Sequence, residues 1–121
     1  MIYVKIVYSH AKCTTCKKAL KWLDNEGIEY QLKDIREERP TAEEFLAIQK
    51  RLDLPIKKMF NTSGAMYREL GLKDKLSEMS LEEATALLAK EGMLVKRPLI
   101  VEGDKATFGF KEDMYQQIWG N

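Results

Sequence analysis

The chain of 121 residues has few of the residue types that build metal sites or disulfide frameworks, with two cysteines, one histidine and three prolines. A zinc site needs four ligands, which this inventory cannot supply from cysteine and histidine alone. No apolar run approaches the roughly 20 residues of a membrane-spanning helix, and the first ten residues lack the apolar stretch of a signal peptide. These absences predict a cytosolic protein that neither holds a structural metal nor inserts into a membrane.

Neither sign of charge is in excess. The 20 lysines and arginines and the 19 aspartates and glutamates give a formal net charge of +1. Binding to phosphates through bulk charge needs a basic surplus or a clear basic stripe, so direct binding to nucleic acid is not expected. With 45% hydrophobic residues, the chain can bury the core of one compact domain.

The first third of the chain predicts a βαβ unit. Residues 2–8 are rich in β-branched and aromatic side chains and residues 29–35 alternate in hydrophobicity, so both are expected to be strands. Residues 14–26 between them are expected to form a helix that Gly27 ends. Its apolar residues have the i, i+3, i+4, i+7 spacing of a packed helix: Cys16, Ala19, Leu20 and Leu23. Since no hairpin turn separates the two strands, they should be parallel.

The middle of the chain predicts helices, and its end predicts a hairpin and one more helix. Capping boxes mark two helix starts, Thr41 with Glu44 and Ser80 with Glu83. We expect the first of these helices to bury Phe45, Ile48 and Leu52, with Ala42 and Leu46 on the same face. Gly71 is expected to end a short helix over 67–72, and Gly92 to end the helix that begins after Ser80. Residues 98–110 read as two strands joined by Gly103-Asp104, and residues 111–119 as a helix with Met114, Ile118 and Trp119 facing inward.

The predicted order is β-α-β, a helical block, then β-β-α. This order predicts an α/β thioredoxin-like fold with a helical lobe, about residues 37–95, inserted between the second and third strands. No linker or change of composition divides residues 1–121, so we expect a single domain.

The two cysteines lie three residues apart, where the first strand has ended and the first helix begins. Unpaired backbone N–H groups and the positive end of the helix dipole should favour the thiolate form of Cys13, and Lys12 and Lys17 add positive potential. Cys16 falls one turn further on, nearer the core, and within disulfide reach of Cys13. In a reducing compartment such a pair is usually catalytic, redox-sensing or metal-binding.

Other interpretations of these residues are less specific. Two incidental core thiols would suit Cys16, but Cys13 falls in a polar loop. A zinc site lacks the additional ligands, because His10 is the only histidine. We expect His10 to be a solvated loop residue that could tune the thiolate.

Arg97-Pro98 stands immediately before the third strand, a position that tolerates proline. X-Pro is the one common cis peptide bond, and thioredoxin-fold proteins carry a cis-proline against their redox cysteines at this place. Arg97 would then direct its guanidinium toward the Cys13 sulfur and hold an oxyanion or polarise the thiolate. The alternative is a surface arginine that flanks a strand.

The stretches CTTCKKALKWL, MYRELGL and LVKRPLIV together resemble the arsenate reductase (ArsC) family in its broad sense, which includes the Spx-type transcriptional regulators. The resemblance covers nearly the whole chain. It implies the fold given above, a catalytic cysteine at Cys13 and an anion-binding arginine at Arg97. In the enzymes of the family the cysteine attacks arsenate, and glutaredoxin with glutathione resolves the adduct. In the regulators Cys-x-x-Cys is a disulfide switch on a protein that binds RNA polymerase.

The chain departs from both branches. The arsenate reductases use two further arginines, whose positions here hold Asn61 and Phe110; Lys57 or Lys58 would be the substitutes. The regulators carry a glycine in the polymerase-contacting stretch that here reads RLDLPIKKMF. The stretch FNTSG (60–64) is similar to both branches and indicates a third subgroup, one with Cys-x-x-Cys.

We interpret the chain as a cytosolic thiol–disulfide oxidoreductase of this family. Cys13 is the nucleophile, Cys16 the resolving thiol, Arg97 the contact to anion or thiolate, and Pro98 shapes the site. No cofactor is expected, because thioredoxin, or glutaredoxin with glutathione, would supply electrons; the substrate would be an oxyanion such as arsenate, or a disulfide. The alternative is an Spx-like redox switch whose partner is RNA polymerase.

Overall fold

The structure is a computed structural model that describes residues 4–120. Residues 2–3 of the predicted first strand lie outside the described residues. The chain divides into two compact units. Residues 4–34 and 97–120 form what we term the sheet unit, and Ile35–Lys96 form the helical unit. The single-domain organisation stays a prediction.

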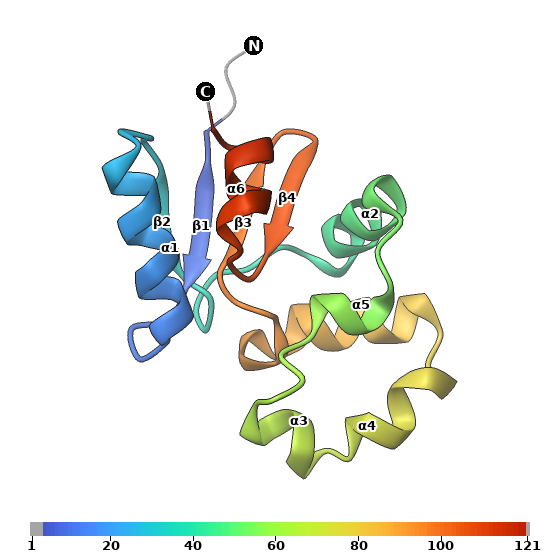
Figure 1. Ribbon diagram of the computed structural model, residues 1–121. Helices are drawn as coiled ribbons and strands as arrows, with labels where there is room; N and C mark the ends of the chain where they lie inside the picture. The colour runs from blue at the N-terminus through green and yellow to red at the C-terminus, as the bar shows by residue number, and fades with distance from the viewer. Residues whose placement is uncertain (1–3, 121) are drawn as a thin grey trace. The chain divides into compact units, whose positions relative to one another are not determined.

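The sheet unit contains four strands and two helices (Figure 1). They are β1 (Ile6–Ser9), α1 (Thr14–Asn25), β2 (Gln31–Asp34), β3 (Leu99–Glu102), β4 (Lys105–Phe108) and α6 (Glu112–Ile118). The sheet order is β2-β1-β3-β4. The parallel pairing of β1 with β2 is confirmed, and β3 is antiparallel to both β1 and β4. The chain therefore has the predicted thioredoxin-like fold.

Helices α1 and α6 pack on one face of this sheet. Val7 of β1 and Ile100 of β3 are paired in register and so point to the same face. That face carries the core of the sheet unit: Val7, Ala19, Trp22, Leu23, Ile100, Tyr115 and Trp119. On α6 the predicted inward positions are confirmed, since Trp119 belongs to this core and the half-buried Met114 and Ile118 pack against it, while the fully buried Tyr115 was not predicted. Tyr115 and Trp119 are one turn apart and form the line that faces the sheet.

The hairpin between β3 and β4 is formed as predicted. Glu102 and Lys105 are opposite each other, and Gly103 takes a positive φ of 57° between them. A two-residue turn of this kind needs left-handed backbone, which glycine adopts without steric cost. Gly27, with φ 68°, likewise follows α1 as expected.

The helical unit is built around two capped helices. Its elements are α2 (Ala42–Leu52), η1 (Ile56–Met59), α3 (Ala65–Glu69), α4 (Leu72–Lys75), η2 (Leu76–Glu78), α5 (Leu81–Lys90) and η3 (Gly92–Leu94), where η denotes a 3-10 helix. Both predicted capping boxes are present. Phe45 and Ile48 are buried, but Leu52 is 37% exposed, so its predicted core position is wrong. Leu52 is the last residue of α2, where the chain turns through Asp53 at a positive φ of 50°.

Gly92 serves a different purpose from the predicted one. Helix α5 ends at Lys90 and Glu91 is extended, so no left-handed glycine ends this helix. A Cβ at Gly92 would collide with the backbone carbonyl of Ile35. The glycine therefore permits a close approach of two backbone segments at the ends of the helical unit.

Arg39 ties the start of the helical unit to the end of α5. Its guanidinium donates to the carbonyl oxygens of Ala89 at 2.7 Å and Lys90 at 2.9 Å, and also to those of Arg36 at 2.8 Å and Ile35 at 3.2 Å. The last carbonyls of a helix have no partner within the helix, so this arginine satisfies groups that would otherwise need water. Among the helices of residues 4–120, none has the length and hydropathy needed to cross a membrane.

Candidate active site

Cys13 is the N-cap residue of α1, as its position in the sequence predicted. Its sulfur accepts a hydrogen bond from the backbone N–H of Cys16 at 3.1 Å. Its own N–H donates to the His10 carbonyl at 3.0 Å, and its carbonyl accepts from the Lys17 N–H at 3.2 Å. The sulfur is thus held at the helix start, where the amide dipoles favour negative charge. Cys13 is half-buried, so an approaching molecule can reach it.

Cys16 lies one turn further along α1 and is only 1% exposed. Burial raises the pKa of its thiol from 9.0 to about 12, and a hydrogen bond and the charge of Cys13 act in the same direction. A hydrogen bond from the His10 backbone and the charge of Arg97 oppose this rise in pKa. Both cysteines are free thiols and close to each other. The pair therefore combines an accessible sulfur with a protonated, protected one.

Arg97 and Pro98 stand beside the two thiols. The peptide bond between them is cis, as expected at this position. The positive charge of Arg97 acts on the Cys16 thiol, which places the guanidinium near the pair. Pro98 is buried, and its carbonyl accepts a hydrogen bond from the Gly109 N–H at 3.0 Å. The sheet unit thus brings all four predicted site residues into one region, while their chemical roles stay predictions.

Tyr115 is a buried residue next to this region. The sequence did not predict its role. Its hydroxyl donates to the Gly109 carbonyl at 2.7 Å, so Gly109 links Tyr115 to Pro98. Burial raises the pKa of Tyr115 above its ordinary value, and the charge of Cys16 acts in the same direction. The ring also meets Trp22 edge to face at 5.5 Å between centroids. Tyr115 is therefore close enough to Cys16 to feel its charge, and it is hydrogen-bonded through Gly109 to the segment that holds the cis-proline. Its spacing of four residues from Trp119 was the sequence signal available.

Phe110 packs into the same cluster instead of facing an anion. Its ring meets that of Tyr115 edge to face, with 4.7 Å between centroids, and it is half-buried. This geometry is the favourable arrangement for two aromatic rings. The position that the resemblance matches to an arginine of the arsenate reductases thus packs here against Tyr115 of α6.

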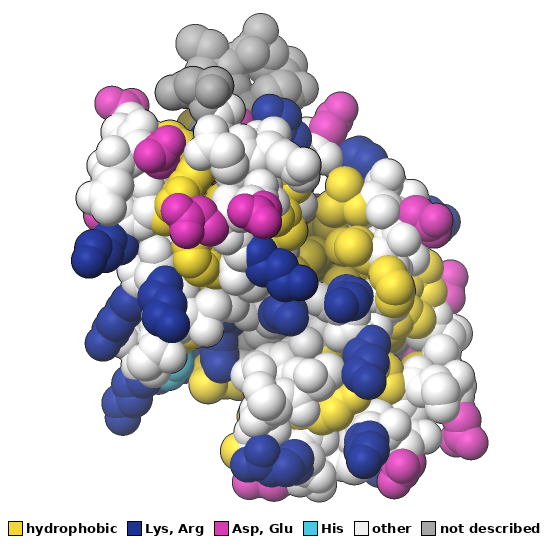
Figure 2. All heavy atoms as spheres, in the orientation of Figure 1, with side chains coloured by type: hydrophobic (Ala, Val, Ile, Leu, Met, Phe, Trp, Pro, Cys, Tyr) yellow, Lys and Arg dark blue, Asp and Glu magenta, His cyan; other side chains and the backbone are white. Residues whose placement is uncertain are grey.

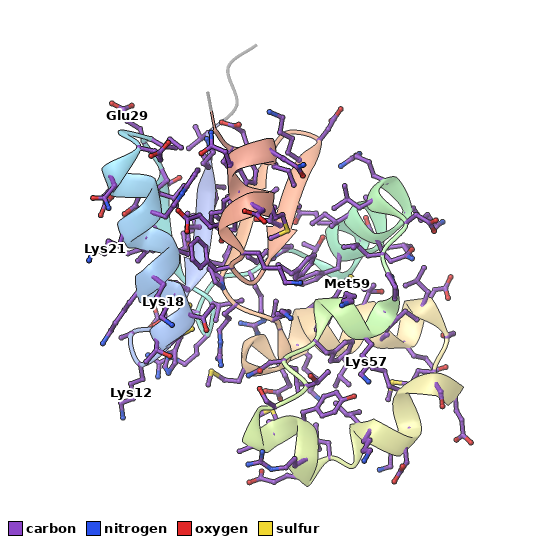
Figure 3. All side chains as sticks on the ribbon, viewed as in Figure 1. Lys12, Lys18, Lys21, Glu29, Lys57 and Met59 are labelled. Atoms are coloured by element: carbon purple, nitrogen blue, oxygen red, sulfur yellow. The ribbon has the colours of Figure 1, made fainter. Side chains whose placement is uncertain are left out.

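Asn61 and the two lysines named as substitutes belong to the helical unit. The Asn61 backbone donates to the Leu94 carbonyl at 2.8 Å, and its side-chain oxygen accepts from the Ser63 hydroxyl at 3.4 Å. Asn61 therefore organises the turn before α3. Lys57, which Figure 3 labels, and Lys58 are exposed on η1.

The environment of His10 differs from the solvated one expected of it. Its Nδ1 atom is buried and the residue is only partly exposed, while its backbone contacts both cysteines of the site. Among residues 4–120, no three histidine, cysteine, aspartate or glutamate side chains are grouped so as to hold a metal ion.

Comparison with known proteins places this geometry in context. The profile of the ArsC family matches residues 8–118. Uncharacterized protein YusI of Bacillus subtilis (strain 168) is 50% identical over 112 residues, which are 93% of this chain and 95% of that protein. The solution NMR structure of SACOL0876 from Staphylococcus aureus COL is also 50% identical and has a TM-score of 0.87, covering 98% of this chain and 100% of that one.

More distant relatives carry two different functional names. The arsenate reductase of Haemophilus influenzae (strain ATCC 51907 / DSM 11121 / KW20 / Rd) is 28% identical over 86% of this chain and 89% of that protein. Global transcriptional regulator Spx 2 of Bacillus cereus (strain ATCC 14579) is 26% identical over 89% of this chain and 81% of that protein. The matches thus span an enzyme and a regulator.

Proposed function

The chain belongs to the ArsC family, and from that premise we propose that it is a thiol–disulfide oxidoreductase with Cys13 as nucleophile and Cys16 as resolving thiol. The observation that carries this proposal is the contrast between the two sulfurs. One is accessible and accepts an N–H at a helix start, and the other is 1% exposed one turn below it. A nucleophile must be reachable as a thiolate, whereas a buried, protonated thiol is protected from outside reactants until it is deprotonated and attacks its neighbour.

The proposed cycle transfers two electrons to a substrate disulfide. The Cys13 thiolate attacks one substrate sulfur, breaks the substrate S–S bond and forms a mixed disulfide, and the first substrate thiolate leaves. Cys16 then loses its proton and attacks the Cys13 sulfur, forming the Cys13–Cys16 disulfide and releasing the second substrate thiolate. The two cysteines are oxidised and the substrate is reduced. An external dithiol restores the reduced pair by the reverse exchange.

The interactions of Cys16 supply a physical reason for the order of these steps. A hydrogen bond and the charge of Cys13 both help to raise the pKa of Cys16. A mixed disulfide at Cys13 carries no negative charge, so its formation removes that repulsion. Burial, the largest cause of the raised pKa, remains, but the His10 backbone hydrogen bond and the Arg97 charge still lower the Cys16 pKa. Cys16 is therefore expected to become a better nucleophile once Cys13 has reacted.

Arsenate is the poorer substrate on grounds of charge. The family's arsenate reductases, by the resemblance noted above, meet a dianion with three arginines, and this chain matches one of them, Arg97. Each missing charge-assisted hydrogen bond forfeits about 1.5–3 kcal/mol, so two missing bonds weaken binding by roughly two to four powers of ten. We propose that arsenate reduction is feeble while the disulfide cycles normally.

Restoring the arginines also has a structural cost in this chain. Phe110→Arg would remove the edge-to-face contact with Tyr115 and expose the apolar surface that the half-buried Phe110 ring now covers. We expect it to lower the free energy of unfolding by about 1–3 kcal/mol, measured by urea denaturation. Phe110→Leu is the control for lost aromatic contact without added charge. An Asn61→Arg, Phe110→Arg variant that gained arsenate turnover at full stability would contradict this assignment of Phe110 to packing.

The second candidate function is a redox switch of the Spx type, with RNA polymerase as the partner. A relative named as a global transcriptional regulator at 26% identity favours it, and the same two thiols would form the switch. The difference lies in turnover, because a switch needs one oxidation and one reduction, whereas an enzyme repeats them.

The deciding experiment is a turnover assay of the purified full chain with arsenate and with a disulfide, each with thioredoxin and with glutaredoxin plus glutathione as donors. No bound cofactor enters the proposed cycle. We expect repeated disulfide turnover that Cys13→Ser abolishes, and mixed disulfides that accumulate on Cys13 in Cys16→Ser. A single oxidation without turnover under either donor, together with oxidation-dependent binding to RNA polymerase, would favour the switch. Saturation by micromolar arsenate would restore arsenate as the substrate.

A further inference from the structure

The charges along α1 run opposite to the order that stabilises a helix. Negative side chains are favourable in the first turn and positive ones in the last turn. Helices α2 and α5 follow this rule, with Glu43 and Glu44 or Glu82 and Glu83 first. In α1 no acidic residue occurs in the first turn and no basic residue in the last. Instead, lysines stand at its start, and Asp24 and Glu26 at its end.

Four lysines lie just before Cys13 or on the first two turns of α1 after it, and we term them the lysine face: Lys12, Lys17, Lys18 and Lys21. All four are exposed, and residues 8–23 contain no aspartate or glutamate. Figure 2 shows dark blue basic side chains gathered over α1, and Figure 3 shows Lys12, in the loop before α1, and Lys21, on α1, extending outward. Lys17 and Lys21 are four residues apart on the helix, a like-charge spacing that destabilises it.

This arrangement opposes the stability of α1 twice, through the helix dipole and through repulsion between lysines. The apolar face of the helix gives no reason for it, since Cys16, Ala19, Trp22 and Leu23 are buried on the opposite side. The same composition with the lysines moved to the last turn would fold at least as well. The position of the charges therefore points to something that approaches Cys13 from outside.

We propose that the lysine face selects an acidic partner, a protein or peptide disulfide flanked by carboxylates. This inference rests on the proposed thiol–disulfide exchange and names its substrate class. Opposite charge across an interface raises the rate of productive encounter and disfavours partners of like charge. The exchange itself is unchanged: the acidic disulfide is the oxidant, takes two electrons from Cys13 and Cys16, and leaves as two thiols.

A role of the lysines in stabilising the Cys13 thiolate alone makes a different prediction. Thiolate stabilisation changes the rate with every disulfide by the same factor, whatever the charge of that disulfide. A docking surface discriminates between disulfides by charge. The two roles are therefore separated by comparing substrates that share the S–S bond and differ only in their flanking groups.

The test uses the reduced full chain and three probes: 3,3′-dithiodipropionate (two carboxylates), 2-hydroxyethyl disulfide (neutral) and cystamine (two ammonium groups). Each rate is divided by that of dithiothreitol with the same probe, which removes differences in leaving group. We expect normalised rates in the order anionic, neutral, cationic at about 0.01 M ionic strength. The differences should vanish near 1 M, where the Debye length falls to about 3 Å.

Matched variants assign the effect to the lysine face. The triple change Lys12→Gln, Lys17→Gln, Lys18→Gln should slow the anionic probe about five- to tenfold, because a unit charge about 10 Å away in water contributes about twofold. The neutral probe should change far less. The control removes three exposed lysines elsewhere, Lys50→Gln, Lys73→Gln and Lys105→Gln, and should keep the order of rates. Lys105 follows the β3–β4 turn, at the end of the sheet opposite Cys13.

Each outcome bears on the proposal. Equal normalised rates for the three probes at low salt would overturn the acidic partner while leaving the exchange chemistry intact. An equal slowing of the neutral and anionic probes in the lysine variant would reduce the lysines to thiolate stabilisers and overturn it too. Absence of reaction with every probe would overturn the proposed function as well. The salt series on the unmodified protein decides the matter independently of how any variant folds.

Discussion

The first turns of α1 in the sheet unit and of α2 and α5 in the helical unit share one hydrogen-bond geometry built from different atoms. Thr41 and Ser80 cap α2 and α5 with hydroxyl oxygens that each accept the N–H three residues on, at 3.1 Å. Cys13 caps α1 with a sulfur that accepts the Cys16 N–H, also at 3.1 Å. The backbone arrangement is the same, while the capping atom is an oxygen in the helical unit and a thiol sulfur in the sheet unit.

The third residue after the cap completes the contrast. In α2 and α5 it is Glu44 or Glu83, which accepts the N–H of the cap residue and closes the capping box. In α1 it is Cys16, buried and without a carboxylate to return that bond. The capping box, which stabilises a helix by about 1 kcal/mol, is thus replaced in α1 by two thiols at the same two positions, Cys13 and Cys16.

The largest expected effect is on the rate of alkylation of Cys16, the third residue after the cap of α1. This rate measures how well the fold protects that thiol. Since burial raises its pKa from 9.0 to about 12, its thiolate fraction at pH 8 falls by up to about a thousandfold relative to the unfolded chain. Iodoacetamide at pH 8 should therefore modify Cys13 in the native protein and leave Cys16 unmodified, as read by peptide mass spectrometry. In guanidinium chloride both should react. Labelling of native Cys16 as fast as Cys13 would contradict the protected position.

The same shift predicts how stability depends on pH in the reduced protein. Native Cys16 keeps a proton that the unfolded chain loses above pH 9, so the native state binds more protons between about pH 9 and 12. The free energy of unfolding should consequently decrease with pH across this window, by up to a few kcal/mol. Urea denaturation from pH 8 to pH 10.5 measures the slope. Cys16→Ala should have a shallower slope, and an identical slope in both proteins would rule out this linkage.

The C-terminal ends of α5 and α1 also differ. Arg39 donates to the last carbonyls of α5, whereas α1 has no basic residue in its last turn. Arg39→Met keeps the length of the side chain but removes four donated hydrogen bonds to carbonyls. We expect a loss of about 2–3 kcal/mol, as charge-assisted bonds are partly replaced by water. The rate of Cys13 alkylation should stay within twofold. Lys90→Met, which removes an exposed charge from the same turn, serves as the control with little effect.

The smallest effects come from exchanging the caps themselves. Thr41→Ala and Ser80→Ala should each cost about 1 kcal/mol and leave disulfide exchange unaffected. Cys13→Ser should keep the stability of α1 or raise it slightly, because a hydroxyl is the stronger cap, and should abolish exchange. Thermal denaturation and the exchange assay together measure both quantities. A Cys13→Ser protein much less stable than the parent would show that the Cys13 sulfur also stabilises the fold by packing.

The sequence predicted local features well and the support of the site poorly. The capping boxes, the parallel βαβ unit, the Gly103 turn and the Cys13 helix start all depend on residues close in sequence. Tyr115 and Arg39 escaped prediction because their partners are distant or belong to the backbone. Arg39 bonds to carbonyls about 50 residues away, which no side-chain pattern records.

The errors have the same origin. Gly92 was expected to end a helix because glycine often does, yet the constraint on it is the carbonyl of Ile35 in another segment. Leu52 continued the apolar stripe of α2 in the sequence, but α2 ends at that residue. Phe110 was compared with an arginine, while its actual neighbour is the ring of Tyr115. Periodicity identifies the face of a helix, and only the tertiary structure identifies what that face meets.

The depth of Cys16 beneath Cys13 also bears on oxidative damage. A thiolate that meets hydrogen peroxide becomes a sulfenic acid, which further peroxide converts irreversibly to sulfinic acid. In this protein the Cys16 thiol lies one turn below and is 1% exposed. Under the proposed function it would condense with the sulfenic acid and release water. The competition is then between an intramolecular step and a bimolecular one at low peroxide concentration. Cys13 should therefore survive repeated oxidation in the parent protein and be lost to sulfinic acid in Cys16→Ser.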